Sequence, residues 1–318
     1  MKIFYTDDFV IPLPEGHRFP MEKYSLLRRK VCEAGLVPPQ NLCVPHAATD
    51  EEILRGHDPQ YLCRVKTGDL SDKEMRRVGF PWSMEMVERA RRSCGATIEA
   101  CRAALEDGLA VSLAGGTHHA FRDYGQGYCV FNDSAIASFA MQAEGRAVRV
   151  VVIDCDAHQG NGTASILQND ATVFTFSIHA HNGFPFRKER SDLDIPLHDG
   201  ADDATYLDAL KGALVRALKL AGADLAIYLS GADPYLNDRF GRLSLTKEGL
   251  ANRDRLVLHH CHGASLPVAI TMGGGYARQI QDTVDIHFET VKIAAEMEKQ
   301  KPQPDRKETG PKREDLIR

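Results

Sequence analysis

The sequence lacks several features that define other classes of protein. None of its eight cysteines forms a Cys-x-x-Cys pair, so neither a zinc ribbon nor a thioredoxin-like motif is predicted. No apolar run approaches the ~20 residues that a membrane-spanning helix requires, and residues 1–8 carry charges where a signal peptide has an apolar core. We therefore expect a cytoplasmic protein with reduced thiols and no membrane partner.

An excess of basic residues is also missing. The formal net charge is −5 at pH 7, with 39 Lys and Arg against 44 Asp and Glu. A protein that binds nucleic acid through its phosphates usually concentrates positive charge over a broad surface. The composition therefore predicts no direct nucleic-acid partner, and it does not indicate an oligomeric state.

What is present is an alternation of short apolar stretches with longer segments of helical periodicity. Such an alternation predicts an α/β fold in which an open parallel sheet is covered by helices on both faces. The expected strands span residues 109–114, 148–153, 172–178, 225–230 and 268–272. The expected helices span residues 21–34, 83–106, 132–144, 204–220, 246–262 and 283–298.

Metal-binding residue types follow two of these strands. Asp154, Asp156 and His158 occupy alternate positions after residues 148–153, and residues two apart in an extended chain point to the same side. Asp233 follows residues 225–230. Carboxylate oxygen and imidazole nitrogen suit Zn²⁺, and Fe²⁺ is compatible with the same donors. Asp156, His158 and Asp233 would leave a fourth position for water or substrate, as a catalytic metal requires.

Acid, base and hydrogen-bond donor groups follow two further strands. His118 and His119 come after residues 109–114, and imidazoles can take a proton from water and return one to a leaving amine. Tyr276 closes a run of three glycines after residues 268–272, where its hydroxyl could donate to a developing oxyanion. Ligands of open parallel sheets bind at the carboxyl ends of the strands, so these motifs are expected to meet.

Each motif alone has a simpler explanation. The aspartates could cap a helix, the histidine pair could lie in a solvated loop, and the glycines could form a tight turn. Their coincidence at one sheet edge favours a hydrolytic site instead. By contrast, His259, His260 and His262 end a predicted helix, where imidazoles interact with the helix dipole, and a second metal site is not expected there.

The spread of these motifs bears on domain organisation. Groups at positions 118 to 276 must meet in one site, so we expect a single catalytic domain over residues 1–298. Residues 180–200 lose periodicity and gain Pro, Gly and charge, which predicts a long loop beside the site. Residues 299–318 are charged and have no apolar face, which predicts a disordered tail.

In their order along the chain, the tandem His, the Asp-x-Asp-x-His, the later Asp and the glycine-rich loop ending in Tyr resemble the histone deacetylase family. The resemblance runs from Tyr5 to the helix after Tyr276, and residues 16–21 and 185–189 are most similar to class IV and bacterial members. It implies an arginase/deacetylase-like fold and zinc-dependent removal of acetyl or longer acyl groups from lysine side chains.

The resemblance also implies roles for individual residues. Asp154 would orient His118, and Asn161 would be the partner of His119. A neutral amide raises the pKa of an imidazole less than a carboxylate does, which would leave His119 more readily deprotonated. The positions that match a structural K⁺ or Na⁺ site are Asp154, Asp156, His158, Ser177 and Ile178. The positions that match the acyl-lysine channel are Gly127, Tyr128, Phe184, Pro185 and Gly274.

There are three alternatives to a lysine deacylase: one with a different substrate, one with a different metal and reaction, and one without catalysis. The same chemistry would serve an acetylpolyamine or another small N-acyl amine, so the substrate is not determined. A manganese ureohydrolase needs further carboxylates where this chain has Gly160 and Tyr235, so one metal is the better interpretation. A non-catalytic protein that binds acyl ligands is disfavoured, because no catalytic residue type is missing.

Overall fold

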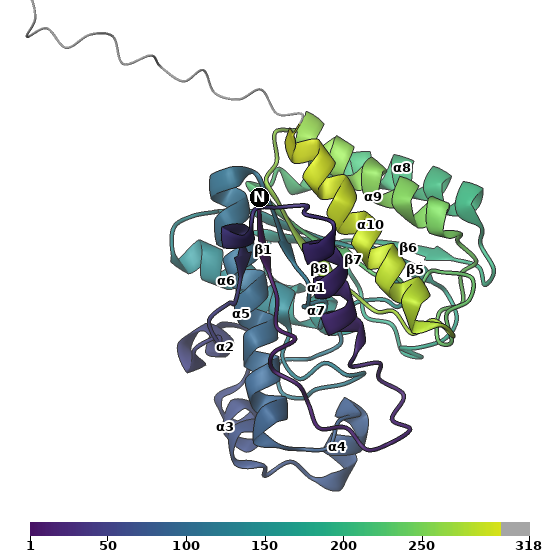
Figure 1. Ribbon diagram of the computed structural model, residues 1–318. Coiled ribbons are helices and arrows are strands. Elements are labelled where there is room, and N and C mark those ends of the chain that lie inside the picture. The colour runs from purple at the N-terminus through teal and green to yellow at the C-terminus, as the bar shows by residue number, and fades with distance from the viewer. Residues whose placement is uncertain (300–318) are drawn as a thin grey trace, which may run out of the picture.

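The computed structural model describes residues 1–299 and contains one sheet in the order β2-β1-β3-β8-β7-β4-β5-β6 (Figure 1). Every neighbouring pair of strands is parallel. The strands are β1 Lys2–Phe4, β2 Leu42–Cys43, β3 Leu109–Ser112, β4 Val150–Asp154, β5 Val173–Ala180, β6 Leu193–Leu197, β7 Leu225–Ser230 and β8 Val268–Met272. The open parallel α/β fold expected from the sequence is confirmed.

Helices cover both faces of this sheet. On one face α1, α8, α9 and α10 pack side by side, and on the other α5 and α6 pack together with the smaller α2 (Figure 1). The larger helices are α1 Lys23–Glu33, α5 Met84–Asp107, α6 Asp133–Ala143, α8 Asp203–Ala221, α9 Lys247–Gly263 and α10 Ile280–Lys299. The short ones are α2 Asp50–Gly56, α3 Pro59–Thr67, α4 Asp72–Val78 and α7 Asn161–Leu167.

Two hydrophobic cores lie on the two faces because side chains alternate along each strand. In β4, Ile153 belongs to the core beside α1, α8, α9 and α10, whereas Val152 belongs to the core beside α5 and α6. In β7, Tyr228 and Ile227 divide in the same way. All residues of β4 and β7 are buried, which explains their continuous apolar runs.

One expectation from the sequence was wrong. Residues 180–200 were expected to form a loop, but β6 lies within them and pairs in parallel with β5, with Ile195 opposite Ile178. Asp194 and Pro196 within β6 make it unlike a strand in the sequence. The proline is tolerated because β6 is an edge strand with one free side.

The end of α10 marks the limit of the described chain. The predicted tail lies outside the described residues except for Lys299, which is the last residue of α10. Among residues 1–299, no helix combines the length and the apolar character needed to span a membrane. The sheet edge at which the strands end carries the loops of the candidate site.

Candidate active site and metal centre

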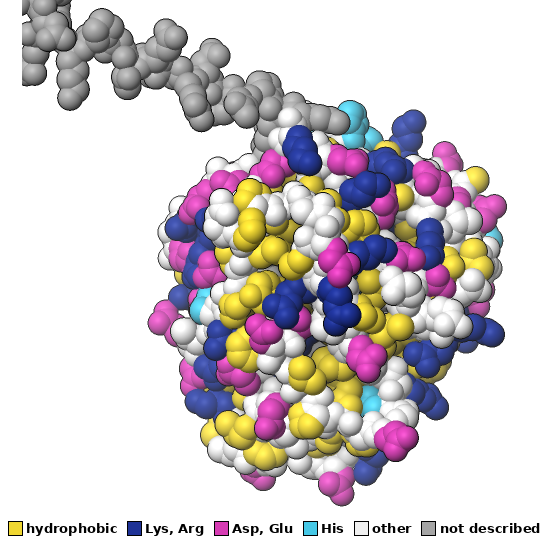
Figure 2. Space-filling model, viewed as in Figure 1, with side chains coloured by type: hydrophobic (Ala, Val, Ile, Leu, Met, Phe, Trp, Pro, Cys, Tyr) yellow, Lys and Arg dark blue, Asp and Glu magenta, His cyan; other side chains and the backbone are white. Residues whose placement is uncertain are grey.

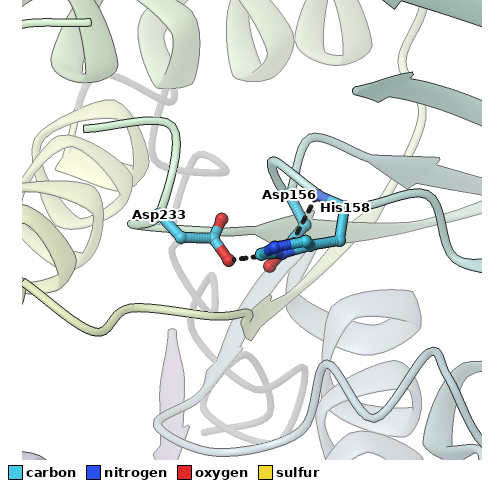
Figure 3. Close-up of side chains that lie close together, drawn as sticks. All are labelled: Asp156, His158 and Asp233. Atoms are coloured by element: carbon cyan, nitrogen blue, oxygen red, sulfur yellow. Dashed lines mark hydrogen bonds and ion pairs between the residues drawn. The ribbon is translucent and has the colours of Figure 1, made fainter. Parts of the chain in front are cut away.

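Three metal-ligating side chains meet beyond the carboxyl ends of β4 and β7. Asp156 and His158 follow β4, Asp233 follows β7, and the two strands are neighbours in the sheet. Figure 3 shows the three side chains pointing toward one another from two loops. His158 Nδ1 lies 3.0 Å from Asp156 Oδ1 and 3.0 Å from Asp233 Oδ2. One ligand atom from each residue lies within 4.8 Å of the others, so the group could hold a metal ion.

The burial of this group fits a bound cation. Asp156 and Asp233 are 1% and 0% exposed, and two adjacent buried carboxylates are costly unless positive charge neutralises them. Burial, reinforced by Asp156, raises the pKa of Asp233 to about 7. For Asp156, burial is outweighed by the imidazoles of His118 and His158, which hold its pKa well below the usual value.

The glycine loop after β8 comes unusually close to these carboxylates. The Gly274 N–H donates to Asp156 Oδ2 at 2.6 Å. A Cβ at Gly274 would lie 2.1 Å from Asp233 Oδ2 and 2.8 Å from Asp156 Oδ2, so only glycine permits this approach. The loop thereby brings Tyr276 to the same end of the sheet.

The tandem histidines have partners of different charge. His118 Nδ1 lies 2.7 Å from Asp154 Oδ2, and His119 Nδ1 lies 2.8 Å from Asn161 Oδ1. For His118, burial is outweighed by the carboxylates of Asp154 and Asp156, which raise its pKa to about 9. For His119, burial together with the positive charges of His118 and His158 holds the pKa well below the usual value. The pair therefore offers one charged and one neutral imidazole near neutral pH.

A buried aspartate that the sequence did not single out holds the loop before these histidines. Asp133 accepts from the N–H groups of Gly116 and Thr117 at 3.0 and 2.8 Å, and from the Thr117 and Thr97 hydroxyls at 2.8 and 2.7 Å. A Cβ at Gly116, whose φ is +64°, would lie 2.6 Å from the Met272 carbonyl oxygen. The only sequence signal was the Asn-Asp pair that begins a predicted helix.

A second buried residue that was missed supports the start of α6. His57 Nε2 accepts from the Asn132 N–H at 2.8 Å, and its Nδ1 lies 3.2 Å from the Arg122 carbonyl oxygen. Asn132 in turn caps α6 by accepting from the Ala135 N–H. Since one ring nitrogen accepts, His57 is neutral, and burial lowers its pKa to about 4.

Arg253 was likewise missed. Its fully buried guanidinium donates to the carbonyl oxygens of Cys155 and Gly231, which lie on the two loops that carry the metal-ligating residues. Asp254 neutralises this charge at 2.8 Å. An arginine within a helical pattern gives no sequence signal of such a contact.

A cavity of about 770 Å³ leads from the surface to these groups. Its lining includes His118, His119, Asp156, His158, Asp233 and Tyr276. Of the five positions predicted for the channel, Gly127, Tyr128, Phe184 and Gly274 line it. Pro185 does not: it is buried, while its neighbours Phe184 and Phe186 reach the cavity.

Comparison with known proteins accounts for this arrangement. Residues 17–291 match the family model described as the histone deacetylase domain. The chain belongs to the histone deacetylase family. The sequence-based assignment is thus confirmed, and the family consists of deacetylases, which are hydrolases.

Relatives of this family member share most of its length. It is 45% identical over 285 residues to an uncharacterized protein of Picosynechococcus sp., covering 90% of this chain and 95% of that protein. It is 28% identical over 301 residues to histone deacetylase 2 of Arabidopsis thaliana, covering 90% and 78%. The crystal structure of an HDAC homolog from Aquifex aeolicus superimposes with a TM-score of 0.80 at 22% identity, covering 93% and 84%, which shows a shared fold.

The aromatic side chains around Tyr276 define the wall of this family member's cavity. The Tyr276 ring centroid lies 5.0 Å from that of Phe240 and 5.9 Å from that of Tyr128. Phe184, which also lines the cavity, packs edge-on against His119 with ring centroids 4.8 Å apart. Burial raises the pKa of Tyr276 well above its usual value, so its hydroxyl remains protonated.

The remaining predicted positions fall on β5 and α9. Ser177 lies opposite Asp154 in the register of β4 and β5, and Ile178 follows it. The histidines at 259, 260 and 262 lie near the end of α9, His260 and His262 in its last turn, and they do not form a metal-ligating group within the described chain.

Proposed function

We propose that this protein is a zinc-dependent hydrolase that removes acyl groups from lysine side chains of peptides or proteins. One observation supports this most strongly: the candidate metal ligands, the histidine pair and Tyr276 all line a single cavity. Membership of the deacetylase family gives the reaction class.

The donor set of Asp156, His158 and Asp233 fits Zn²⁺, and Fe²⁺ is compatible with it. The backbone of Gly274 lies close to both carboxylates, and both carboxylates are buried. These features favour a small, strongly held cation over a solvated one. When bound, such an ion polarises the substrate carbonyl and acidifies water.

The histidine pair divides the proton transfers. His119 Nδ1 donates to Asn161 Oδ1, so Nε2 carries the lone pair that can accept a proton from the attacking water. His118, held as an imidazolium by Asp154, can donate a proton to the lysine nitrogen as the amide C–N bond breaks. The products are a carboxylate and a free lysine amine.

Tyr276 supplies the hydrogen bond that matters most in the transition state. Its protonated hydroxyl would donate to the substrate oxygen as negative charge develops there. Its loop is fixed by the Tyr276 N–H, which donates to Asp238 Oδ2 at 2.6 Å.

The channel walls fit a slender aliphatic chain. Tyr128 and Phe184 offer aromatic faces, and Gly127 lets the backbone lie close to the rings of His119 and Phe184, since a Cβ there would lie 2.9 Å from His119 Cδ2 and 3.1 Å from Phe184 Cε1. A lysine side chain carrying an amide has the required shape and polarity.

A structural K⁺ or Na⁺ site is part of the proposal. It would use Asp154, Asp156, His158, Ser177 and Ile178. The parallel register that places Ser177 opposite Asp154 supports it, because carboxylate, hydroxyl and main-chain oxygens are the ligands that hard cations prefer.

The proposed function is tested by turnover of matched peptides whose lysine carries acyl groups from acetyl to long-chain, with acetylpolyamines alongside. Metal-dependent release of the free amine from the peptides is expected. If only the acetylpolyamines are cleaved, the substrates are small N-acyl amines rather than peptides. If folded, zinc-loaded protein cleaves nothing, a binding role is favoured.

A further inference from the structure

The mouth of the cavity is rich in arginine. The exposed residues Arg18, Arg76, Arg77, Arg239 and Arg242 line it, and the buried Lys23 lies deeper. Among residues 1–299, the only acidic residues in the same lining are Asp156 and Asp233, which belong to the candidate metal centre. In the part of the chain that the structure describes, the entrance therefore presents positive charge with no acidic residue of its own.

Most of these arginines have no carboxylate partner among the described residues. Within residues 1–299, Arg18, Arg76, Arg77 and Arg239 form no ion pair, whereas Arg242 pairs with Asp199 at 2.8 Å. Arg77 lies over the Tyr124 ring at 4.5 Å, which leaves its N–H groups available at the edge.

The carboxylate next to Arg239 in the sequence is engaged elsewhere. Asp238, next to Arg239, accepts from the N–H groups of Phe240, Gly241 and Tyr276. Its carboxylate thus satisfies the backbone of the loop that carries Arg239. The Arg239 Nε donates to the Tyr276 carbonyl oxygen at 3.0 Å, which fixes the guanidinium beside the entrance.

This concentration is local. The whole chain has a net charge of −5, and on the face drawn in Figure 2 the Lys and Arg side chains are interspersed with Asp and Glu. The arginines at the mouth come from three separate segments: the chain before α1, the end of α4 and the loop after β7. Folding gathers them around one opening.

We propose that this arginine rim, composed of Arg18, Arg76, Arg77, Arg239 and Arg242, selects peptides with acidic side chains beside the acyl-lysine. The inference rests on the proposed function and gives its substrate class. Arginine pairs with carboxylate through two parallel hydrogen bonds, and unlike charges at a rim speed association and suppress the wrong partners. Lysine-rich tails and cationic acetylpolyamines would be repelled by the same rim.

The test uses three acetyl-lysine peptides that differ only in two flanking residues: Glu, Gln or Lys. The zinc-loaded full chain is expected to cleave the Glu peptide with a kcat/KM about fivefold above the Gln peptide, the combined effect of two exposed ion pairs. The Lys peptide should fall below the Gln peptide. The Glu preference should largely disappear at 1 M salt, where the screening length is about 3 Å.

Variants separate the rim from general charge effects. R76Q/R77Q is expected to bring the Glu-to-Gln ratio of kcat/KM toward 1. The control R146Q, which removes an exposed arginine outside the cavity lining, should leave the ratio unchanged. Equal kcat/KM for all three peptides, or a ratio unaffected by R76Q/R77Q, would overturn the inference while leaving the hydrolase intact.

Binding gives a readout that does not depend on turnover. Dissociation constants of the three peptides for Y276F should follow the order Glu, Gln, Lys from tightest to weakest. If that order is found but the wild-type chain cleaves none of the peptides, the proposed selectivity of the rim is supported and the proposed hydrolase activity is rejected. The absence of that order in both binding and turnover rejects the rim.

Discussion

His118 and His119 are adjacent in the chain, and their ring centroids lie 4.0 Å apart, yet a carboxylate faces the first and an amide faces the second. Asp154 stabilises the imidazolium of His118, while Asn161 offers His119 an acceptor without charge. Two neighbouring imidazolium ions would repel each other, so the pair favours one proton over two. The difference in partner thus assigns different proton-transfer roles to the two rings.

Replacing Asn161 with Asp should alter the pH dependence. A carboxylate next to His119 would raise its pKa by ~1–3 units, so the base would be protonated over a wider pH range. The acidic limb of the kcat/KM profile should move to higher pH, with zinc content unchanged. An unshifted acidic limb would remove His119 from the role of base.

Tyr276→Phe should lower kcat by roughly 10²–10³-fold, the usual effect of losing one oxyanion donor. The hydrogen bonds that fix this loop are made by the N–H and the carbonyl oxygen of Tyr276 and not by its hydroxyl. Folding and zinc content should therefore be retained in the variant. Near-normal turnover by the variant would show that Tyr276 does not stabilise the transition state.

Asp133→Asn should weaken the loop before the histidines. The new amide N–H₂ would face N–H and O–H donors, so at least one of them loses its acceptor, at ~1–3 kcal/mol of unfolding free energy. Chemical denaturation measures this, and kcat/KM should fall with it. The control D202N lies at the N-cap of α8, where Asn caps as well as Asp, and should change neither quantity.

His57 should make stability depend on pH. Its folded pKa of about 4 is below the unfolded value near 6.5, so between these values the unfolded chain binds more protons. The contribution of His57 is full above pH 6.5 and declines by up to roughly 3 kcal/mol as the pH falls to 4.

Denaturation of the wild type and His57→Gln across this range checks the expectation. The stability difference between them should be largest at pH 7 to 8 and should shrink toward pH 4. His262→Gln, at an exposed histidine, should show no such trend. A difference that stays constant with pH would mean that His57 does not remain neutral in the folded protein.

The sequence predicted the central part of the fold because buried parallel strands leave continuous apolar runs, as in β4 and β7. It did not predict α2, α3 and α4, since helices of seven to nine residues carry too few turns for a clear period. The arginine rim was missed because its residues come from three separate segments, one of them the unpredicted α4. The strand β6 was hidden by its edge position and its proline.

The candidate site divides in the same way. Residues such as Asp156 and His158 were predictable because strand ends and spacing place them together. Asp133, His57 and Arg253 were not predictable from the sequence, because their contacts join segments that are distant in sequence. These contacts depend on how the helices pack against the sheet. The hydrogen bonds that hold the loops of the site thus follow from tertiary packing, which a local sequence pattern does not reveal.

The most direct test of the central claim is a zinc titration of metal-free protein with an acetyl-lysine peptide as substrate. Turnover should be absent without metal and should rise to a plateau at one zinc per chain, and Asp233→Ala should neither bind the ion nor gain activity. Full turnover by the metal-free chain, or zinc bound at Asp156, His158 and Asp233 without any turnover, would contradict the account.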